Sequence, residues 1–298
     1  MTSANKPRHL SVAIASYVKR PKLRPDDRIL SSALEAEGIE AHPVVWDDES
    51  VQWDTFSGCV LRSVSDYHLK YQQFLGWLSS VAEAVPIWNS AKLVTWNSDK
   101  SHLRSLAAEG IPIVPTHWLE RGERADLTEL LDANGWEEAV LKPTVGLGAQ
   151  NLHRAHREQA SAQQTLEELL AQGGVMVQPF LPSLEEHGET SLIFVDGKPS
   201  HTVRKRPAAG DFRVQAGWGG SVSTVEPNPA ESALAEQVMA SLPIAPLFAR
   251  VDTVLLPSGS PGLIELELIE PILYFEQAPQ VAALIAKSIR RSLAAAPR

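Results

Sequence analysis

The sequence predicts a mixed α/β protein with a parallel sheet in its first third and antiparallel hairpins in its last third. In the first hundred residues, short apolar runs alternate with amphipathic stretches, which is typical of parallel strands connected by helices. In the last third, two pairs of apolar runs are each joined by a turn segment that contains glycine. The chain has 298 residues, enough for two or three packed lobes.

The individual elements follow from periodicity and from turn residues. The predicted strands of the first third are LSVAIASYV, EAHPVVW, GCVLR and VPIWN, and its helices are RILSSALEAEG and HLKYQQFLGWLSSVAEA. We expect Asn97 or Ser98 to cap a further helix that ends at Gly110. The middle third predicts strand WEEAVLKP, which runs into a glycine-containing loop and another strand up to NLHR, then helix SAQQTLEELLAQGG and strand VMVQPFLP. The last third predicts a hairpin with Asp196-Gly197 at its turn, a second hairpin formed by RVDTVLL and LIELELIEP, and a final helix, PQVAALIAKSIRRSL.

Composition argues against two classes of partner. The net charge is −9 and no long basic stripe exists, which argues against nucleic-acid binding, although a small anionic ligand stays open. No apolar run approaches the roughly 18–20 residues of a membrane span, and the N-terminal apolar run reads as a first strand rather than a signal peptide. The single cysteine, Cys59, is expected to be a buried strand residue and fits a reducing, cytoplasmic location.

Three acids of the second hairpin suggest a metal site. Alternate residues of a strand face the same side, so Glu265 and Glu267 share a face, and Asp252 can reach that face from the partner strand. Three converging carboxylates repel one another unless a cation lies between them, and oxygen donors suit Mg²⁺. The alternative is a solvated strand face with alternating glutamates.

Basic residues occur at two further places. Lys142 ends an apolar strand before a loop with Gly146 and Gly148, whose amides could approach phosphates, although common phosphate-loop motifs are absent. An inward lysine needs an anionic partner. Lys205, Arg206 and Arg213 flank a glycine-rich stretch and could neutralise a transferring phosphoryl group, or could simply form an exposed loop.

Several polar residues follow predicted strands and are candidates for a substrate pocket, because ligands collect at the carboxyl ends of parallel strands. They are Tyr17, Arg24, Arg62, Asp66 and Tyr67. The alternative for Arg62 and Asp66 is a surface ion pair. His201 lies near the basic cluster and could serve either packing or substrate contact.

Taken in order, these segments resemble the ATP-grasp superfamily, and the glutathione synthetase-like branch most of all. That branch ends with an Asp on one strand, Glu-x-Asn on the next and a Pro four residues later, a spacing matched by Asp252, Glu265-Leu266-Glu267 and Pro271. Glu267 stands where Asn is usual. The resemblance implies an N-terminal α/β domain (1–97), a central lid subdomain (98–180) and a C-terminal ATP-grasp subdomain (181–298).

The resemblance also implies roles for single residues. Lys100 and Lys142 match the two nucleotide lysines, the second one beneath a mobile loop around Gly146 and Gly148. Glu189 stands at the position of the ribose-binding acid, while Lys205 and Arg213 match residues near the γ-phosphate and the acyl substrate. The linker whose backbone reads the adenine edge corresponds to Gln178, Pro179, Phe180 and Leu181.

Within the branch, the chain is similar to the group that includes the O-ureido-D-serine cyclo-ligase of D-cycloserine biosynthesis. The segments that carry this likeness include WDDESVQWDTF, WNSDKSHL and VRKRPAAGDFRVQAGWGGSV. The implied activity uses ATP with Mg²⁺, or Mn²⁺, to join a small carboxylate to an amine through an acyl-phosphate. The resemblance leaves a homodimer open. Two alternatives also stay open: a ligase that modifies a peptide or protein terminus, and a nucleotide-binding regulator without turnover.

Overall fold

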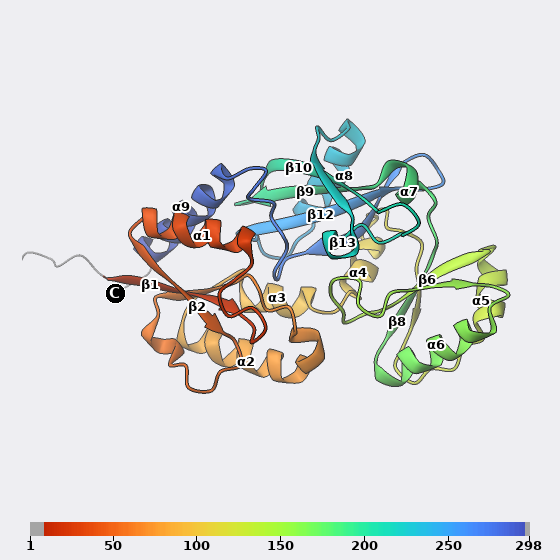
Figure 1. The fold of residues 1–298 in the computed structure, drawn as a ribbon, viewed down its shortest axis with the longest axis horizontal. Helices are drawn as coiled ribbons and strands as arrows, with labels where there is room; N and C mark the ends of the chain where they lie inside the picture. The colour runs from red at the N-terminus through yellow and green to blue at the C-terminus, as the bar shows by residue number, and fades with distance from the viewer. Residues whose placement is uncertain (1–8, 296–298) are drawn as a thin grey trace, which may run out of the picture.

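The structure, a computed structural model that describes residues 9–295, is built around three β-sheets (Figure 1). Helices accompany each sheet, so the predicted mixed α/β class is confirmed. The first sheet contains strands from the first third of the chain, the second from the middle and the third from the last part. Each of the three predicted segments therefore contains one sheet, although the cores do not follow the segment boundaries, as described below.

The first sheet is entirely parallel, with strand order β2-β1-β3-β4. Val12 and Ile14 of β1 contact one hydrophobic core, while Ala13 and Ala15 contact another on the opposite face. Burial on both faces explains why this strand is continuously apolar rather than alternating. Its strands and helices are β1 (Leu10–Ser16), α1 (Pro25–Ala36), β2 (Ile39–Val45), β3 (Gly58–Leu61), α2 (Tyr71–Ala84) and β4 (Ile87–Trp88).

The second sheet is antiparallel, with strand order β5-β8-β6-β7, and α6 packs on it. Asp126 caps α5 by accepting from the backbone N–H of Glu129 at 3.0 Å, and Gly135 ends the helix in the left-handed region at φ +67°. The elements are β5 (His117–Leu119), α5 (Leu127–Asn134), β6 (Glu138–Pro143), β7 (His153–His156), α6 (Ala160–Gln172) and β8 (Val175–Pro179).

The third sheet is antiparallel, with strand order β11-β10-β9-β12-β13. Both predicted hairpins are confirmed, and Asp196 and Gly197 both have positive φ, as a tight two-residue turn requires. A capping box between Asn228 and Glu231 starts α8. The elements are α7 (Ser183–His187), β9 (Glu189–Val195), β10 (Lys198–Arg206), β11 (Ser221–Thr224), α8 (Pro229–Ala240), β12 (Phe248–Leu255), β13 (Pro261–Glu267) and α9 (Gln280–Ala295).

The helix cap predicted at Asn97 or Ser98 is wrong. Two short helices occupy this region, α3 (Ala91–Asn97) and α4 (His102–Ala108), and Ser101 is the cap position of α4. Asn97 instead makes long-range backbone contacts: its amide donates to Leu266 O and accepts from Leu268 N, both at 2.8 Å. The residue therefore joins α3 to the end of β13. Several elements escaped prediction, namely α3, α5, α7, α8, β5 and β11.

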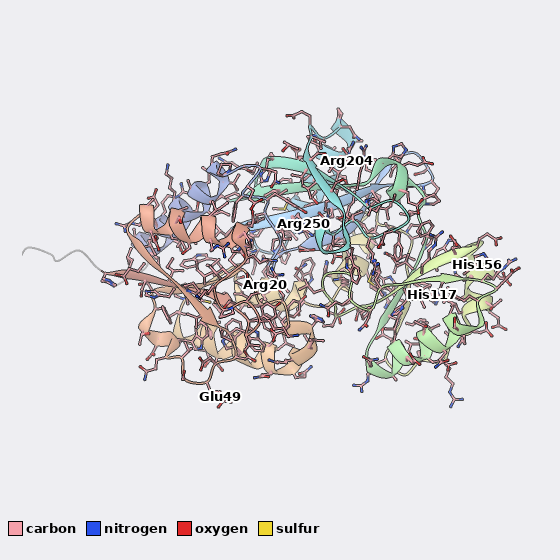
Figure 2. All side chains as sticks on the ribbon, in the orientation of Figure 1. Arg20, Glu49, His117, His156, Arg204 and Arg250 are labelled. Carbon is pink, nitrogen blue, oxygen red and sulfur yellow. The ribbon has the colours of Figure 1, made fainter. Side chains whose placement is uncertain are left out.

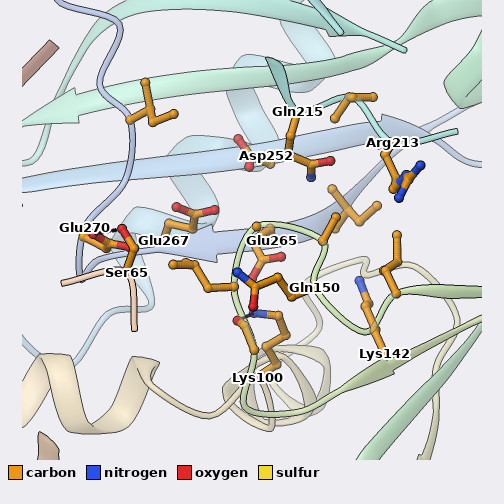
Figure 3. Close-up of a pocket in the computed structure, with 18 of the residues that line it drawn as sticks. Ser65, Lys100, Lys142, Gln150, Arg213, Gln215, Asp252, Glu265, Glu267 and Glu270 are labelled. Atoms are coloured by element: carbon orange, nitrogen blue, oxygen red, sulfur yellow. Dashed lines mark hydrogen bonds and ion pairs between the residues drawn. The ribbon is translucent and has the colours of Figure 1, made fainter. Parts of the chain in front are cut away.

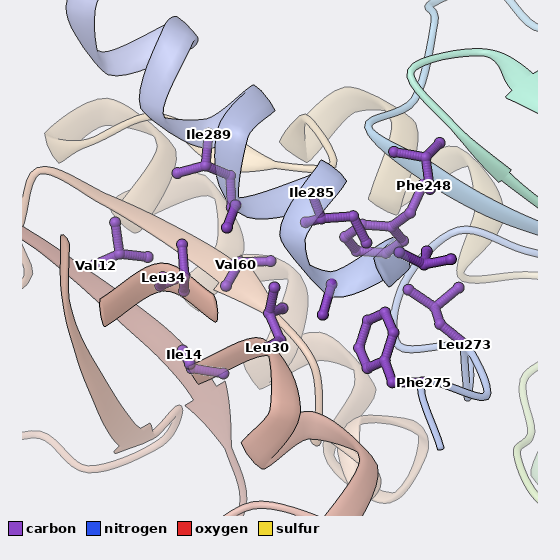
Figure 4. Close-up of a cluster of buried hydrophobic side chains, with 14 of the residues drawn as sticks. Val12, Ile14, Leu30, Leu34, Val60, Phe248, Leu273, Phe275, Ile285 and Ile289 are labelled. Carbon is purple, nitrogen blue, oxygen red and sulfur yellow. The ribbon is translucent and has the colours of Figure 1, made fainter. Parts of the chain in front are cut away.

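The first and last elements of the chain share one hydrophobic core (Figure 4). Side chains of α1 such as Leu30 and Leu34 pack with Ile285 and Ile289 of α9, and Phe248 of β12 joins them. A second core brings Leu103 and Leu106 of α4 against α8 and the third sheet, although these residues fall in the segment predicted as the lid. The second sheet has a core of its own.

Two predictions about single features can be checked against the fold. Cys59 is fully buried in β3, and burial raises the pKa of its thiol, which makes it an inert core residue. Within residues 9–295, every helix is too short or too polar to cross a bilayer.

Candidate functional site

A cavity of about 680 Å³ brings most of the predicted site residues together. Its walls come from strands of the second and third sheets and from loops, including those that follow β1 and β3 of the first sheet. Eighteen of the twenty-one predicted positions line it: Tyr17, Arg24, Asp66, Tyr67, Lys100, Lys142, Gly146, Gly148, Gln178, Pro179, Phe180, Leu181, Glu189, Lys205, Arg213, Asp252, Glu265 and Glu267.

One face of the third sheet presents a row of charges to this cavity. Residues directly opposite each other on adjacent strands share a face, and the register sets Lys205 opposite Glu189 and Asp252 opposite Glu265. Gly188, at φ +77°, lets β9 approach β10 here, because a Cβ at this position would lie 2.3 Å from the Lys205 carbonyl oxygen. The opposite face of β12 and β13 carries core residues such as Val251 and Leu266.

Arg250 lies between two of the predicted metal ligands, and Figure 2 shows it on β12 in the middle of the molecule. Its Nη2 lies 2.9 Å from Asp252 Oδ2 and also bonds Glu267 Oε1. Asp252 accepts further bonds from Ser191 Oγ at 2.6 Å and Lys205 Nζ at 3.2 Å. The cation that the converging carboxylates require is therefore supplied in part by the protein itself.

The pKa values in this row follow from its pairing. Burial works against ionisation of Asp252, but Arg250 and Lys205 outweigh it and hold the Asp252 pKa below its ordinary value. For Glu189, burial dominates and raises the pKa to about 7 despite the adjacent Lys205. Burial likewise raises the pKa of Glu267, although Arg250 opposes the shift.

Lys100 and Lys142 lie on the opposite wall (Figure 3). Lys100 Nζ bonds Glu265 Oε1 at 2.8 Å and donates to Gly146 O at 3.0 Å, so it links β13 to the glycine loop. Lys142 is buried and forms no ion pair with any residue between 9 and 295. Burial lowers the pKa of the Lys142 ammonium, and Glu265 only partly opposes this. An anionic ligand would supply the missing partner.

The glycine loop, residues 144–152, contacts elements on both sides of the cavity. His68 and Gln150 form a hydrogen bond of 3.2 Å, and Trp218 Nε1 donates to Gly148 O at 3.4 Å. Arg213 stacks on the Trp218 ring at 3.5 Å and pairs with Asp211 at 2.7 Å. These contacts hold the loop as part of the cavity wall.

The predicted adenine linker follows β8. Gln178 is buried and its side chain donates to Thr116 at 2.8 Å. Phe180 lies between the Arg154 guanidinium, 3.6 Å from its ring centre, and Phe212. This end of the cavity therefore offers an aromatic face together with strand-end backbone groups, which suits a flat heterocycle.

The end of the cavity away from Lys142 is lined by a separate group of polar side chains. Tyr67, Ser65, Arg24, Glu270 and Tyr274 line it. Of the predicted pocket residues here, Asp66 is already engaged, since it accepts from Trp46 Nε1 at 2.7 Å and pairs with Lys70 at 3.2 Å.

Two predicted substrate residues do not line the cavity. Arg62 is fully buried; it pairs with Asp27 at 2.8 Å and donates to Pro271 O at 2.7 Å, so neither a substrate contact nor a surface pair with Asp66 describes it. His201 lies on β10 beside Ser200, outside the cavity wall, and burial lowers its pKa. We assign neither residue a substrate contact.

Arg250, Glu270 and Ser65 line the cavity but were not predicted as site residues. Arg250 could have been found, because it lies two residues before Asp252 on the same predicted strand and so faces the same side. Glu270 and Ser65 have no such signal. They are 205 residues apart, and only the tertiary fold brings Ser65 Oγ to 3.1 Å from Glu270 Oε2.

The side chains present fit Mg²⁺, but with two protein carboxylates rather than the three that the sequence suggested. Within residues 9–295, no cluster of three acidic, histidine or cysteine side chains is arranged to hold a metal. Mg²⁺ commonly takes only one or two protein carboxylates and completes its coordination with phosphate oxygens and water. Glu265 and Glu267, on one face of β13, meet that requirement.

Comparisons with known proteins now decide the family. Residues 12–89 match the family model described as D-cycloserine synthetase DcsG, N-terminal domain, and residues 113–254 match prokaryotic glutathione synthetase, ATP-grasp domain. The cycloserine biosynthesis protein DcsG of Streptomyces lavendulae is 31% identical, over 89% of this chain and 92% of that protein. The chain belongs to the DcsG family of ATP-grasp ligases.

Structures agree with this assignment to the DcsG family. The crystal structure of D-cycloserine synthetase DcsG matches with a TM-score of 0.86 and 29% identity, covering 95% of this chain and 99% of that one. A D-alanine–D-alanine ligase from Bacillus anthracis matches with a TM-score of 0.68 at 16% identity, covering 96% and 97% of the two chains. The second likeness shows the shared ATP-grasp fold alone.

Proposed function

We propose that this chain is an ATP-dependent carbon–nitrogen ligase of cycloserine biosynthesis that closes the ring of O-ureido-D-serine. The observation that carries the proposal is the cavity, where a buried lysine without an ion pair among the described residues faces a row of paired acids. Similarity to DcsG extends over nearly the whole chain, and the match to the DcsG N-terminal model, residues 12–89, includes Arg24, Ser65 and Tyr67 at the far end of the cavity.

The residues divide between the nucleotide and the reacting acid. The strand end at Gln178 to Leu181, with Phe180 between Arg154 and Phe212, would hold adenine, and Glu189 would contact the ribose. Lys142 and Lys100 would neutralise phosphate oxygens. Lys205, Arg213 and Arg250 supply positive charge where a phosphoryl group passes to a substrate carboxylate.

Phosphorylation solves a chemical problem for the substrate. A free carboxylate is a poor electrophile, because an oxide would have to leave. An acyl-phosphate can lose inorganic phosphate when a nitrogen attacks its carbonyl carbon. In O-ureido-D-serine the attacking O-linked nitrogen carries a carbamoyl group, so ring closure gives an N-carbamoyl ring, and hydrolysis must then release carbon dioxide and ammonia to leave D-cycloserine. The chain needs no nucleophilic side chain for this sequence, and the glycine loop over the cavity would keep water from the acyl-phosphate.

A bound Mg²⁺ would neutralise phosphate charge and fix the phosphate geometry. Glu265 and Glu267 would hold it, with Asp252 oriented beside them by Ser191 and Arg250. Arg250 and Lys100 now bond these acids, so both side chains are in position to turn toward phosphate oxygens instead.

The test is ADP release by the purified chain with MgATP and a panel of carboxylic acids. We expect release with O-ureido-D-serine and formation of D-cycloserine. Release only with a peptide would support a ligase that acts on a peptide or protein terminus. Tight ATP binding without release on any substrate would support a regulator and contradict the proposal.

A further inference from the structure

Glu270 differs from every other acid on the cavity wall. The six acids that line the cavity are Asp66, Glu189, Asp252, Glu265, Glu267 and Glu270. Five of them have a lysine or arginine nitrogen at 3.2 Å or less. For Glu270 the nearest such nitrogen is Arg24 Nη2, at 3.8 Å.

Arg24 is committed elsewhere. Its Nε lies 2.9 Å from Asp27 Oδ2, and its Nη2 donates to the backbone carbonyl of Arg62 and, at 3.0 Å, to the carbonyl of Glu270 itself. The strong bonds of this guanidinium therefore go to Asp27 and to main-chain oxygens. The Glu270 carboxylate receives only a long contact from it.

One oxygen of Glu270 lacks any hydrogen-bond donor among residues 9–295. The side chain is 1% exposed; Oε2 accepts from Ser65, whereas Oε1 is buried without a partner among the described residues. A buried carboxylate oxygen without a donor costs about 1–3 kcal/mol or more, so native proteins seldom keep one unless a bound water, an ion or a ligand completes it.

The position of Glu270 indicates which ligand group would do so. Figure 3 shows Glu270 and Ser65 at one end of the cavity and Lys142 at the other, with Glu265 and Glu267 between them. A ligand that spans the cavity would have its phosphates at the lysine end and its reacting carboxylate near the paired acids. The group beyond that carboxylate meets Glu270, an acid that needs a cationic donor.

We propose that Glu270 binds the ammonium group of the substrate, with Ser65 orienting the carboxylate, and so selects α-amino acids over acids that lack an amine. The ammonium of an α-amino acid lies two bonds from its carboxyl carbon, which suits a site next to the reacting carboxylate. This assignment rests on the proposed ligase function and adds a specificity-determining residue to it.

The experiment compares O-ureido-D-serine with its analogue that lacks the α-amino group, using wild type, E270Q and E276Q. Glu276 is an exposed glutamate of the same segment and serves as the matched control. We expect E270Q to raise KM for the amino acid by about 10- to 100-fold, since a hydrogen bond to a charged group contributes about 1.5–3 kcal/mol. Its kcat, its KM for ATP and its kinetics with the analogue should stay near wild-type values.

A second variant covers the case in which E270Q fails to fold. Ser65→Ala keeps the Glu270 carboxylate and removes only the hydrogen bond that orients it. KM for the amino acid should therefore rise less than in E270Q, and KM for the analogue should not change. The Tm of each variant identifies a merely structural effect. Equal losses on both substrates, or a fall in kcat alone, would overturn the assignment.

The two proposals fail in different ways. If the wild type uses another amino acid and ignores O-ureido-D-serine, the proposed substrate is wrong, and the comparison is made with that amino acid and its amine-free analogue. If the wild type forms D-cycloserine while E270Q treats both substrates alike, the Glu270 assignment is wrong and the ligase function stands.

Discussion

The acids at the two ends of the cavity differ in how they are paired. At the end that we propose for the phosphates, Glu189, Asp252, Glu265 and Glu267 are each paired with Lys100, Lys205 or Arg250, so every acid of this row has a cationic partner before any ligand binds. At the substrate end, Glu270 has one carboxylate oxygen without a donor among the described residues. An acid that is already paired is held in position, whereas an acid with an unpaired oxygen can select a ligand.

Removing Arg250 should have the largest effect, because it takes away a cationic partner of both Asp252 and Glu267. Arg250→Met leaves Glu267 and Asp252 facing each other, and losing one partner of a buried ion network costs about 3–5 kcal/mol. Urea denaturation at pH 7.5 measures this loss in the free energy of unfolding. Arg291→Met is the control, since its exposed pair with Asp196 should contribute less than about 1 kcal/mol. Similar losses in both variants would contradict the comparison.

Removing Lys142 should affect turnover rather than stability. The Lys142 ammonium has no ion pair within residues 9–295, so Lys142→Met should not lower Tm. Loss of one positioned donor to a developing charge costs about 10²–10³-fold in rate, and we expect ADP release to fall by that factor. Lys287→Met, on the exposed side of α9, should match wild type. A destabilised Lys142→Met protein with normal turnover would refute this role.

The pH dependence of kcat/KM tests the proposed role of Glu270. Burial raises the pKa of Glu270 to about 7, with Arg24 opposing the shift and Asp27 and Glu267 adding to it; Tyr67 also faces this group. Because the pKa of this acid is raised, its carboxylate form predominates only above pH 7. Amino-acid binding should therefore weaken by up to about tenfold for each pH unit below 7. The amine-free analogue should lack this dependence, and so should E270Q; a shared profile would exclude Glu270 as its source.

The smallest effect is expected for Glu267→Asn, which installs the residue usual in glutathione synthetase-like relatives. Arg250 keeps Asp252 as a partner, so the fold should hold. The metal site loses one negative charge, and the Mg²⁺ concentration for half-maximal ADP release should rise several-fold. An excess of EDTA should stop release in both proteins. An unchanged Mg²⁺ requirement would show that Glu267 serves Arg250 alone.

The sequence predicted features that depend on neighbours along the chain. Strand alternation sufficed to set Glu265 and Glu267 on one face, and the Asp196-Gly197 turn marked its hairpin. Contacts between distant segments were not predictable in this way. Asn97 is of a residue type favoured at helix caps, but its side chain bonds the backbone near the end of β13. Arg62 follows a strand, yet it is buried against Asp27. Glu270 lacks a close cationic partner because Arg24, 246 residues away in the sequence, bonds the main-chain carbonyl of Glu270 instead of its carboxylate.

The shared core of α1 and α9 has a consequence for how such enzymes diversify. The first third of the chain supplies the loops at the substrate end, so exchanging it is an obvious route to a new substrate. Its outer helix, however, is covered by the last helix of the chain. A recombination event that replaces residues 1–97 alone would leave α9 against a foreign surface. New specificities in this family should therefore arise either by point changes around the cavity or by exchanging both ends of the gene together.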